Sequence, residues 1–244
     1  MECSPLISIV TVSFNALKTI EQTILSVVNQ TYPNIEYIII DGGSTDGTVD
    51  IIKKYEDKIA YWVSEPDKGI YDAMNKGIEK ASGEWINFMN SGDEFYNENV
   101  LRDVFLKENL KEVDVLYGDV VVKLPKKEVL KKATPLQNIE KWMVFCHQST
   151  FVRTKLHREN FFNITYKICA DYDFFLKLYR KRKKFRYLSK VISKFLHGGV
   201  SDSLMKVSVE SWHISGMKNS KRFLFVIAKE FFLGRFIRFY SKWI

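Results

Sequence analysis

The chain has 244 residues, of which 46% are hydrophobic and 27% charged, so it can bury a core and is neither disordered nor fibrous. Its length predicts one large domain with at most a small appendage. Its three cysteines (Cys3, Cys146, Cys169) have no C-x-x-C spacing, which argues against a disulfide framework and a structural zinc site and favours a reducing cytoplasm.

Charge is distributed unevenly along the chain. The net charge is +8, yet residues 1–100 hold 7 Lys and Arg against 16 Asp and Glu, whereas residues 101–244 hold 30 against 13. We therefore expect the two halves to face different partners. The sequence shows neither a signal-peptide pattern nor an apolar run of about 18 residues, so we expect a soluble or peripheral protein.

The first hundred residues alternate short β-branched runs with helical periodicity, a pattern typical of a parallel sheet with crossover helices. Strands are expected at residues 7–13, 35–40, 59–63 and 85–89. Helices are expected from the spacing of Leu17, Ile20, Ile24, Val27 and Val28 and near residues 47–56 and 70–82. The predicted architecture is doubly wound α/β, in which ligands bind beyond the carboxyl ends of the strands.

We expect fewer regular elements in the second half of the chain. Strands are expected at residues 113–122, 146–152 and 187–196, and helices at residues 172–182 and over the last thirty residues. A stretch rich in Lys and Pro that runs to about residue 140 is expected to be a mobile surface loop rather than a linker between domains.

The loop at residues 41–48 (DGGSTDGT) follows a predicted strand and precedes a predicted helix. Its glycines lack the G-x-G-x-x-G spacing and no Lys follows Gly47, so it is neither a dinucleotide fingerprint nor a P-loop. Asp41 could accept hydrogen bonds from a base or ribose. The alternative is a turn with an Asx hydrogen bond and a helix cap at Asp46.

Five segments, taken in order, resemble the inverting glycosyltransferases of family 2, which have the GT-A fold. They are residues 7–15 (ISIVTVSFN), 30–48 (QTYPNIEYIIIDGGSTDGT), 67–77 (DKGIYDAMNKG), 81–84 (ASGE) and 87–93 (NFMNSGD). The resemblance implies one GT-A domain over residues 1–217. Its nucleotide-sugar half would be about 1–120 and its acceptor half about 121–217.

The resemblance also implies roles on the nucleotide side. The backbone around Val12 and Phe14, with Asn15, would hold the uracil end of a nucleotide, and Asp41 would bind its base or ribose. Lys68 would approach the nucleotide, although a solvated turn lysine is the alternative.

Residues 90–93 fall where the family carries its acidic metal motif. Asn90 or Ser91 stands in place of the first acid of that motif. The resemblance implies that Ser91 contacts the nucleotide-sugar. Asp93 is the expected ligand of Mn²⁺ or Mg²⁺, cations that carboxylates and phosphate oxygens hold together, and Glu94 is an open second ligand. The alternative is a turn with Gly92 in a left-handed conformation.

On the acceptor side, residues 170–176 (ADYDFFL) resemble the acidic segment that opens the family's acceptor helix. Asp171 would be the catalytic base, with a helix cap as the alternative, and Asp173 lies close enough to exchange roles with it. His147 and Gln148 would line the acceptor pocket. His197, followed by two glycines, would bind the metal beside the diphosphate.

The tail at residues 218–244 holds seven Lys and Arg against one acid, Glu230. Arg235, Arg238 and Lys242 fall on one helical stripe, and Phe236, Ile237, Tyr240 and Trp243 on the other. This amphipathic pattern predicts an interfacial helix on an anionic membrane, the inner face of the cell membrane, with a core-packed helix as the alternative. No nucleic-acid reading module accompanies the charge, so no nucleic acid is expected.

With the resemblance, these features predict a metal-dependent inverting transferase that moves a hexose or related sugar from a nucleotide-sugar, with a UDP-sugar favoured, to a saccharide or lipid-linked acceptor of a surface polysaccharide. One alternative is a sugar nucleotidyltransferase, which is disfavoured because no triphosphate loop follows the first strand. The other is a catalytically inactive basic module that binds membranes or nucleic acid, which the missing first metal acid would suit.

Overall fold

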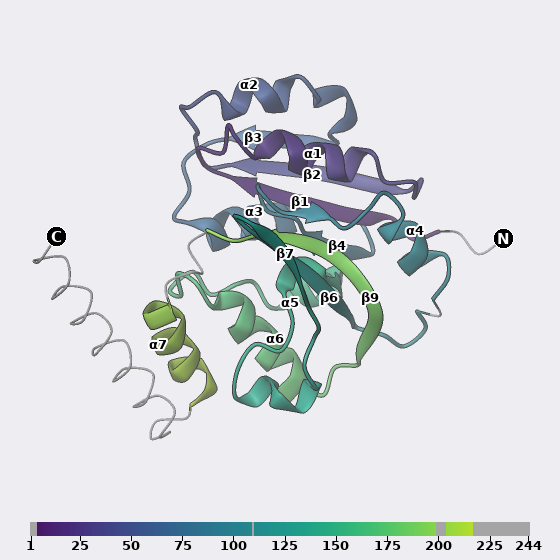
Figure 1. The fold of residues 1–244 in the computed structure, drawn as a ribbon, viewed down its shortest axis with the longest axis vertical. Coiled ribbons are helices and arrows are strands. Elements are labelled where there is room, and N and C mark those ends of the chain that lie inside the picture. Colours follow the sequence, from purple (N-terminus) through teal and green to yellow (C-terminus); the bar gives the residue numbers. More distant parts are fainter. Residues whose placement is uncertain (1–3, 109, 199–203, 217–244) are drawn as a thin grey trace, which may run out of the picture.

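The computed structural model describes residues 4–108, 110–198 and 204–216, which build a curved, mostly parallel sheet between two layers of helices (Figure 1). The order of strands is β3-β2-β1-β4-β8-β6-β9-β5, and β7 pairs with β6. The strands are β1 (Ile7–Ser13), β2 (Ile35–Asp41), β3 (Tyr61–Ser64), β4 (Trp85–Phe88), β5 (Glu94–Phe95), β6 (Val115–Leu124), β7 (Lys127–Lys131), β8 (Thr150–Arg153) and β9 (Phe185–Leu196).

Helices cover both faces of this sheet. They are α1 (Ile20–Val28), α2 (Thr48–Lys53), α3 (Ile70–Lys80), α4 (Val100–Phe105), α5 (Thr154–Glu159), α6 (Ala170–Arg180) and α7 (Leu204–Ser215), with 3₁₀ turns η1 (Glu56–Lys58), η2 (Leu136–Glu140) and η3 (His147–Ser149). Neighbouring residues of one strand enter opposite cores: Ile9 packs with α1, α2 and α4, and Val10 with α3, α5 and α6. Burial on both faces explains why β1 and β2 are almost continuously apolar.

The four parallel strands confirm the doubly wound order predicted for the first hundred residues. β1 pairs with β2 and β4, and β2 pairs with β3, all in parallel. The register sets Ser13 beside Asp41 and Asp41 beside Ser64. Three strands therefore end level with one another, and their last side chains meet at one edge of the sheet.

The region after residue 113 differs from its prediction. The expected loop up to residue 140 contains β7, which pairs antiparallel with β6, and η2. The prediction of a loop was wrong because all five residues of β7 are exposed, so the strand carries no buried face that a pattern could reveal. The strand expected at 146–152 begins only at Thr150, after the turn η3.

Short elements were not predicted: β5, α4 and α5 have two to six residues each, too few to show a period. Helix α6 begins at Ala170 rather than at 172, so Asp171 and Asp173 both lie in its first turn. The amphipathic helix predicted at 218–244 lies outside the described residues.

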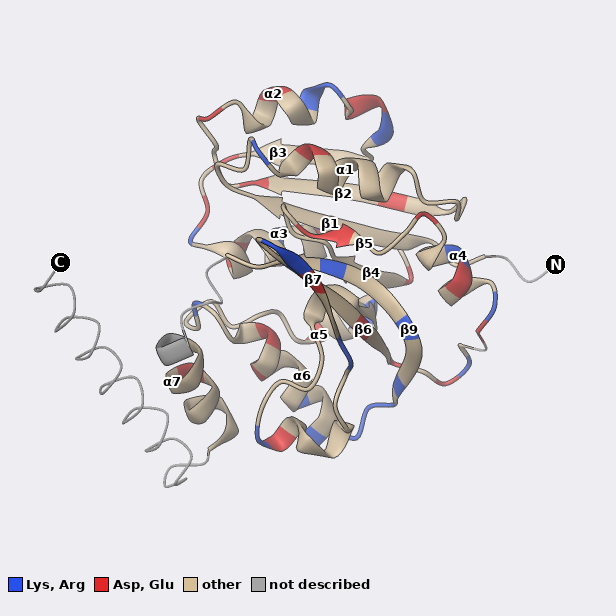
Figure 2. Cartoon of the chain, in the orientation of Figure 1, with Lys and Arg blue, Asp and Glu red and all other residues tan. Residues whose placement is uncertain are grey.

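Figure 2 shows Lys and Arg gathered on β7 and along β9, whereas the central parallel strands are mostly uncharged. Of the helices that the structure describes, none is long and apolar enough to cross a bilayer. Cys146 and Cys169 are free thiols.

Candidate active site

Asp41 lies at the end of β2 with no exposed surface. Its Oδ1 accepts hydrogen bonds from the hydroxyls of Ser13 (2.8 Å) and Ser44 (2.6 Å). Its Oδ2 accepts from the hydroxyl of Ser64 (2.7 Å) and from the backbone N–H groups of Gly43 (3.1 Å) and Ser44 (2.8 Å). Five donors therefore converge on one carboxylate, and they fix the shape of the loop at 41–44.

The electrostatics of Asp41 follow from these contacts. Burial acts to raise the pKa of the carboxyl, but hydrogen bonds from Ser44, Ser64 and Ser13 outweigh it and hold the pKa below its ordinary value. Asp41 is thus ionised at neutral pH and already surrounded by protein donors. A nucleotide that hydrogen-bonds Asp41 has to compete with these donors.

The loops after β1 and β2 are tied together by Asn15, which adopts a left-handed φ of 47°. Its backbone N–H donates to the Ser44 hydroxyl (2.7 Å), and its Oδ1 accepts from the Thr45 N–H (3.0 Å). Phe14 beside it is 63% exposed. A Cβ on Gly42 would lie 2.5 Å from Asp67 Oδ2 and 3.3 Å from the Phe14 ring, so the glycine allows both side chains to approach the loop.

Other residues predicted for the nucleotide lie along the same edge. Val12 is buried, and its carbonyl oxygen accepts a hydrogen bond from the Ser91 N–H (3.1 Å). Lys68 is exposed just before α3, where its N–H donates to Asp72 Oδ2 (3.0 Å). Asp46 Oδ1 accepts from the Thr48 N–H (3.0 Å) in an Asx turn, but the residue that caps α2 is Gly47 rather than Asp46.

A second cluster forms around Asp171 at the start of α6. Its Oδ2 lies 3.0 Å from His147 Nδ1, and its Oδ1 lies 3.1 Å from the Tyr71 hydroxyl. His147 Nε2 in turn lies 3.2 Å from Asn90 Nδ2, and the buried Asn90 Oδ1 has no hydrogen-bond partner in the structure. The side chain of Asp171 is 15% exposed and that of His147 18%.

Tyr71 lies in the segment at residues 67–77 that resembles the family, but the sequence alone indicated no role for it. Burial and the nearby charge of Asp171 raise the pKa of Tyr71 well above its usual value, so the hydroxyl keeps its proton and remains a donor. The same hydroxyl also donates to the Ile168 carbonyl. Only the fold could reveal this residue, because α3 and α6 are separated by a hundred residues.

Asp173 differs from Asp171 in its surroundings. Its Oδ2 pairs with Lys177 Nζ at 2.6 Å, one turn further along α6. The structure therefore separates two acids that the sequence left interchangeable: Asp171 contacts His147 and Tyr71, and Asp173 contacts a lysine.

Asp93 is almost completely buried, and both of its oxygens accept hydrogen bonds. Gln148 Nε2 donates to Oδ2 (2.7 Å), and the Leu196 N–H donates to Oδ1 (3.0 Å). Burial raises the pKa of Asp93 to about 6, although both hydrogen bonds oppose the shift. Gln148, predicted to line the acceptor pocket, is only 3% exposed and supports Asp93 instead.

The predicted metal ligands do not form a ready-made cage. In the described part of the chain no three His, Cys, Asp or Glu side chains are grouped as a metal site. Glu94 pairs with Lys123 (2.7 Å), and His197 is exposed after β9. Asp93 and Asn90 carry oxygens of the type that Mg²⁺ takes together with phosphates and water, but both Asp93 oxygens already accept hydrogen bonds, and only Asn90 Oδ1 is a buried oxygen without a partner.

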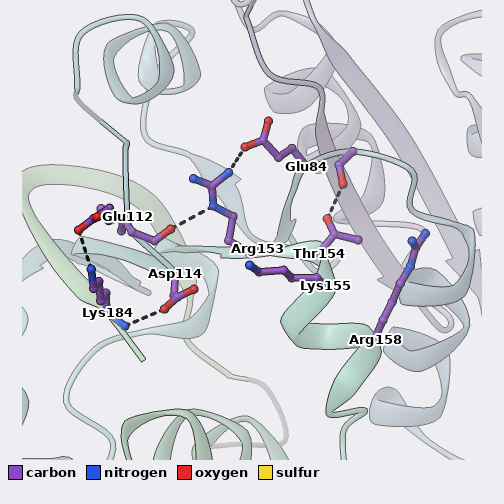
Figure 3. A pocket seen from close by; sticks show the side chains of 10 residues that line it. Glu84, Glu112, Asp114, Arg153, Thr154, Lys155, Arg158 and Lys184 are labelled. Atoms are coloured by element: carbon purple, nitrogen blue, oxygen red, sulfur yellow. Dashed lines mark hydrogen bonds and ion pairs between the residues drawn. The ribbon is translucent and has the colours of Figure 1, made fainter. Parts of the chain in front are cut away.

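A cavity of about 580 Å³ lies at the other edge of the sheet, where β4 and β6 begin (Figure 3). Two ion pairs lie in its lining, Lys184 with Glu112 (2.6 Å) and Arg153 with Glu84. None of the predicted site residues lines it. The candidate active site is instead the carboxyl edge, where the Asp41 loop and the Asp171 cluster lie.

Comparison with known proteins identifies the class. The model of the family described as "Glycosyl transferase family 2" matches residues 8–185. This chain belongs to that glycosyltransferase family. An uncharacterised glycosyltransferase of Mycobacterium tuberculosis is 35% identical over 184 residues, 72% of this chain and 70% of the relative. A PGL/p-HBAD biosynthesis glycosyltransferase of Mycobacterium bovis is 29% identical over 210 residues, 83% and 81% of the two chains.

Solved structures confirm the predicted GT-A fold. S. aureus TarS 1–349 in complex with UDP-GlcNAc matches with a TM-score of 0.68 and 22% identity over 86% of this chain and 66% of that one. The mannosyltransferase PcManGT of Pyrobaculum calidifontis, in complex with GDP-Man and Mn²⁺, matches with a TM-score of 0.66 and 17% identity over 93% and 70%. At these identities the likeness establishes the fold alone.

Proposed function

We propose that this chain transfers a hexose, with inversion, from a UDP-sugar to a saccharide or lipid-linked acceptor of a surface polysaccharide, and that Asp171 is the base. The observation that carries the proposal is the place of Asp171. Its side chain is 15% exposed and contacts His147, which in turn contacts Asn90 of the donor-side loop after β4.

The chemistry requires one carboxylate on the acceptor side. Asp171 removes the proton of the acceptor hydroxyl while that oxygen forms a bond to the anomeric carbon of the donor. The bond from this carbon to the diphosphate oxygen breaks on the opposite face, and the nucleoside diphosphate leaves with the bonding electrons. One displacement of this kind inverts the anomeric configuration.

The donor would bind on the loops after β1 and β2. The exposed ring of Phe14 offers a surface for a base, beside Asn15 and the buried Val12. Asp41 would act on the base or ribose chiefly through the loop that it holds, and Ser91 and Lys68 would approach the rest of the donor.

Metal dependence is part of the proposal. Asp93 and Asn90 would hold Mn²⁺ or Mg²⁺, with His197 beside the diphosphate; the bound cation would neutralise charge that develops on the leaving group. Asn90 Oδ1 supports this role because it is a buried oxygen without a hydrogen-bond partner. PcManGT, with the same fold, was solved with Mn²⁺.

The proposal also covers the acceptor and the location of the enzyme. His147 and Asp173 would meet the acceptor, and Gln148 would act there only through Asp93. The relative from M. bovis is named for PGL/p-HBAD biosynthesis, which favours a cell-surface acceptor. The basic residues of 218–244 would hold the enzyme peripherally on the cytoplasmic face of an anionic membrane, without nucleic acid as a partner.

A donor screen tests the function. UDP- and GDP-sugars are compared by thermal shift with and without Mn²⁺, and the stabilising donor is then incubated with saccharide and lipid-linked acceptors. We expect a UDP-sugar to bind and the product to have the anomeric configuration opposite to that of the donor by NMR. Retention of configuration, or full turnover in excess EDTA, would contradict the mechanism.

A further inference from the structure

Four side chains form a chain of contacts across the candidate site, in the order Asn90, His147, Asp171 and Tyr71. They come from the loop after β4, from η3, from α6 and from α3. The four segments are far apart in sequence, so the fold alone brings them together. The chain links the donor-side motif that contains Asn90 to the acid at the start of α6.

The direction of the hydrogen bonds follows from the chemistry of the groups. Asn90 Nδ2 can only donate, so His147 Nε2 accepts from it. The proton of a neutral imidazole is then on Nδ1, which donates to the carboxylate of Asp171 at 3.0 Å. The tautomer is assigned from these partners, since the amide orientation places Nδ2 toward the ring.

We propose that His147 is a positioning residue of the base: through Nδ1–H it holds Asp171 Oδ2 and so sets the orientation in which the carboxylate meets the acceptor hydroxyl. This inference rests on the proposed function of Asp171. His147 has a defined place of its own, because η3 leads directly into β8 and the Thr150 hydroxyl donates to the His147 carbonyl at 2.6 Å.

His147 holds Asp171 more firmly than Tyr71 does. The Tyr71 hydroxyl has one proton and two acceptors, Asp171 Oδ1 and the Ile168 carbonyl. His147 Nδ1–H has Asp171 as its partner at 3.0 Å. The thiols of Cys146 and Cys169 also lie near Asp171, but burial raises the pKa of each to about 12, so neither supplies charge at neutral pH.

Two substitutions separate the two ring nitrogens. In His147→Asn the amide nitrogen takes about the position of Nδ1 and can still donate to Asp171. In His147→Gln it takes about the position of Nε2 and can contact Asn90 but not Asp171. If His147 had only a structural role, the two variants should have similar activity. If it positions Asp171 through Nδ1, the Asn variant should be the more active one.

We expect kcat of His147→Gln to fall by about 10- to 100-fold and that of His147→Asn by less than about 3-fold, with UDP affinity unchanged in both. The matched controls are His213→Gln, an exposed histidine on α7, and Tyr55→Phe, whose hydroxyl contacts a carboxylate remote from the site (Glu21, 2.9 Å). Equal activity of the Asn and Gln variants, whether both high or both low, would overturn the proposal.

A measurement independent of turnover keeps this test separate from the proposed function. In ¹⁵N-histidine NMR spectra of the full chain, His147 should be the Nδ1–H tautomer, and Asp171→Asn should change its ring shifts. An Nε2–H tautomer that is insensitive to Asp171→Asn would overturn the inference. Failure of the wild-type chain to transfer any sugar, with the Nδ1–H tautomer observed, would instead count against the proposed function.

Discussion

The parallel region (residues 7–88) and the mixed region (residues 94–216) each place one acid at the carboxyl edge of the sheet, but they hold it in different ways. Asp41 takes its donors from the ends of the two neighbouring strands, β1 and β3, and from the loop that follows it. Asp171 takes two of its donors from η3 and α3, elements remote from it in sequence, and a third from the N–H of Tyr172 beside it. Asp41 is fully buried under five protein donors, whereas the side chain of Asp171 is 15% exposed.

We expect the two carboxylates to have different roles because their surroundings differ. A carboxylate with five protein donors shapes a loop, and its removal should be felt as a loss of stability. A carboxylate with few donors and some exposure can still take up a proton, and its removal should be felt as a loss of turnover. The predictions below test whether stability and turnover divide between the two acids in this way.

The largest effect is expected for Asp171→Asn. The substitution keeps the shape of the side chain but removes its ability to accept a proton, so turnover should fall by about 10²–10⁴-fold. UDP affinity by calorimetry and the melting temperature should change little. A folded variant with normal turnover would move the base to Asp173 or to another residue.

Asp41→Ala should lower the stability of the fold, whereas Asp171→Asn should lower turnover. It leaves the hydroxyls of Ser13, Ser44 and Ser64 without their shared acceptor, which should cost about 3 kcal/mol of unfolding free energy and weaken UDP binding through the loop. Urea unfolding and calorimetry measure the two effects. Unchanged stability with weakened binding would show that Asp41 contacts the nucleotide directly.

A pH effect is expected from the mixed region. His157 is buried and stacks on Phe174 at 4.4 Å, and burial lowers its pKa to about 3. The unfolded chain takes up a proton below about pH 6.5 and the folded chain does not, so the unfolding free energy should fall by about 1.4 kcal/mol per pH unit as the pH drops from there toward 3.

His157→Phe tests this effect, because a ring of similar size without a titrating group should remove that part of the pH dependence. Urea unfolding of both proteins at pH 7 and pH 5 gives the comparison. Parallel changes in the two proteins would assign the acid sensitivity to other groups.

The smallest effect is expected for Tyr71→Phe. The hydroxyl shares its proton between Asp171 and the Ile168 carbonyl, so its loss should lower kcat by about 3- to 10-fold, less than His147→Gln does. Steady-state kinetics with Tyr55→Phe as the control provides the test. A larger loss than in His147→Gln would reverse the order of importance inferred for the two donors.

The sequence predicted the parallel region well because each of its units is local. Buried strands, glycine loops and crossover helices follow one another in the chain, so a period and a loop motif are enough to place Asp41, Asn15 and Ser91 on one edge. The saturation of Asp41 was not foreseen. It depends on Ser64, a residue that the register of β2 and β3 brings beside Asp41.

The mixed region was predicted less well because the contacts that build its site are not local in the sequence. The long strands β6 and β9 were expected, but β5 has two residues and β7 is exposed at all five positions, so neither shows a pattern and β7 was predicted to be a loop. Asp171 was found through its motif, but its partners Tyr71 and His147 belong to elements whose meeting no local pattern encodes. Gln148 was assigned to the acceptor, and its buried contact with Asp93 became visible only in the fold.

The pairing of β4 with β8 has a consequence for motion. Trp85 lies beside Arg153 and Ile86 beside Val152 in this antiparallel ladder, and the Arg153 guanidinium stacks 4.0 Å over the Trp85 ring. A hinge between the two regions would have to break this ladder in the middle of the sheet. We therefore expect any movement at the candidate site to involve the surface loops rather than a hinge within the sheet.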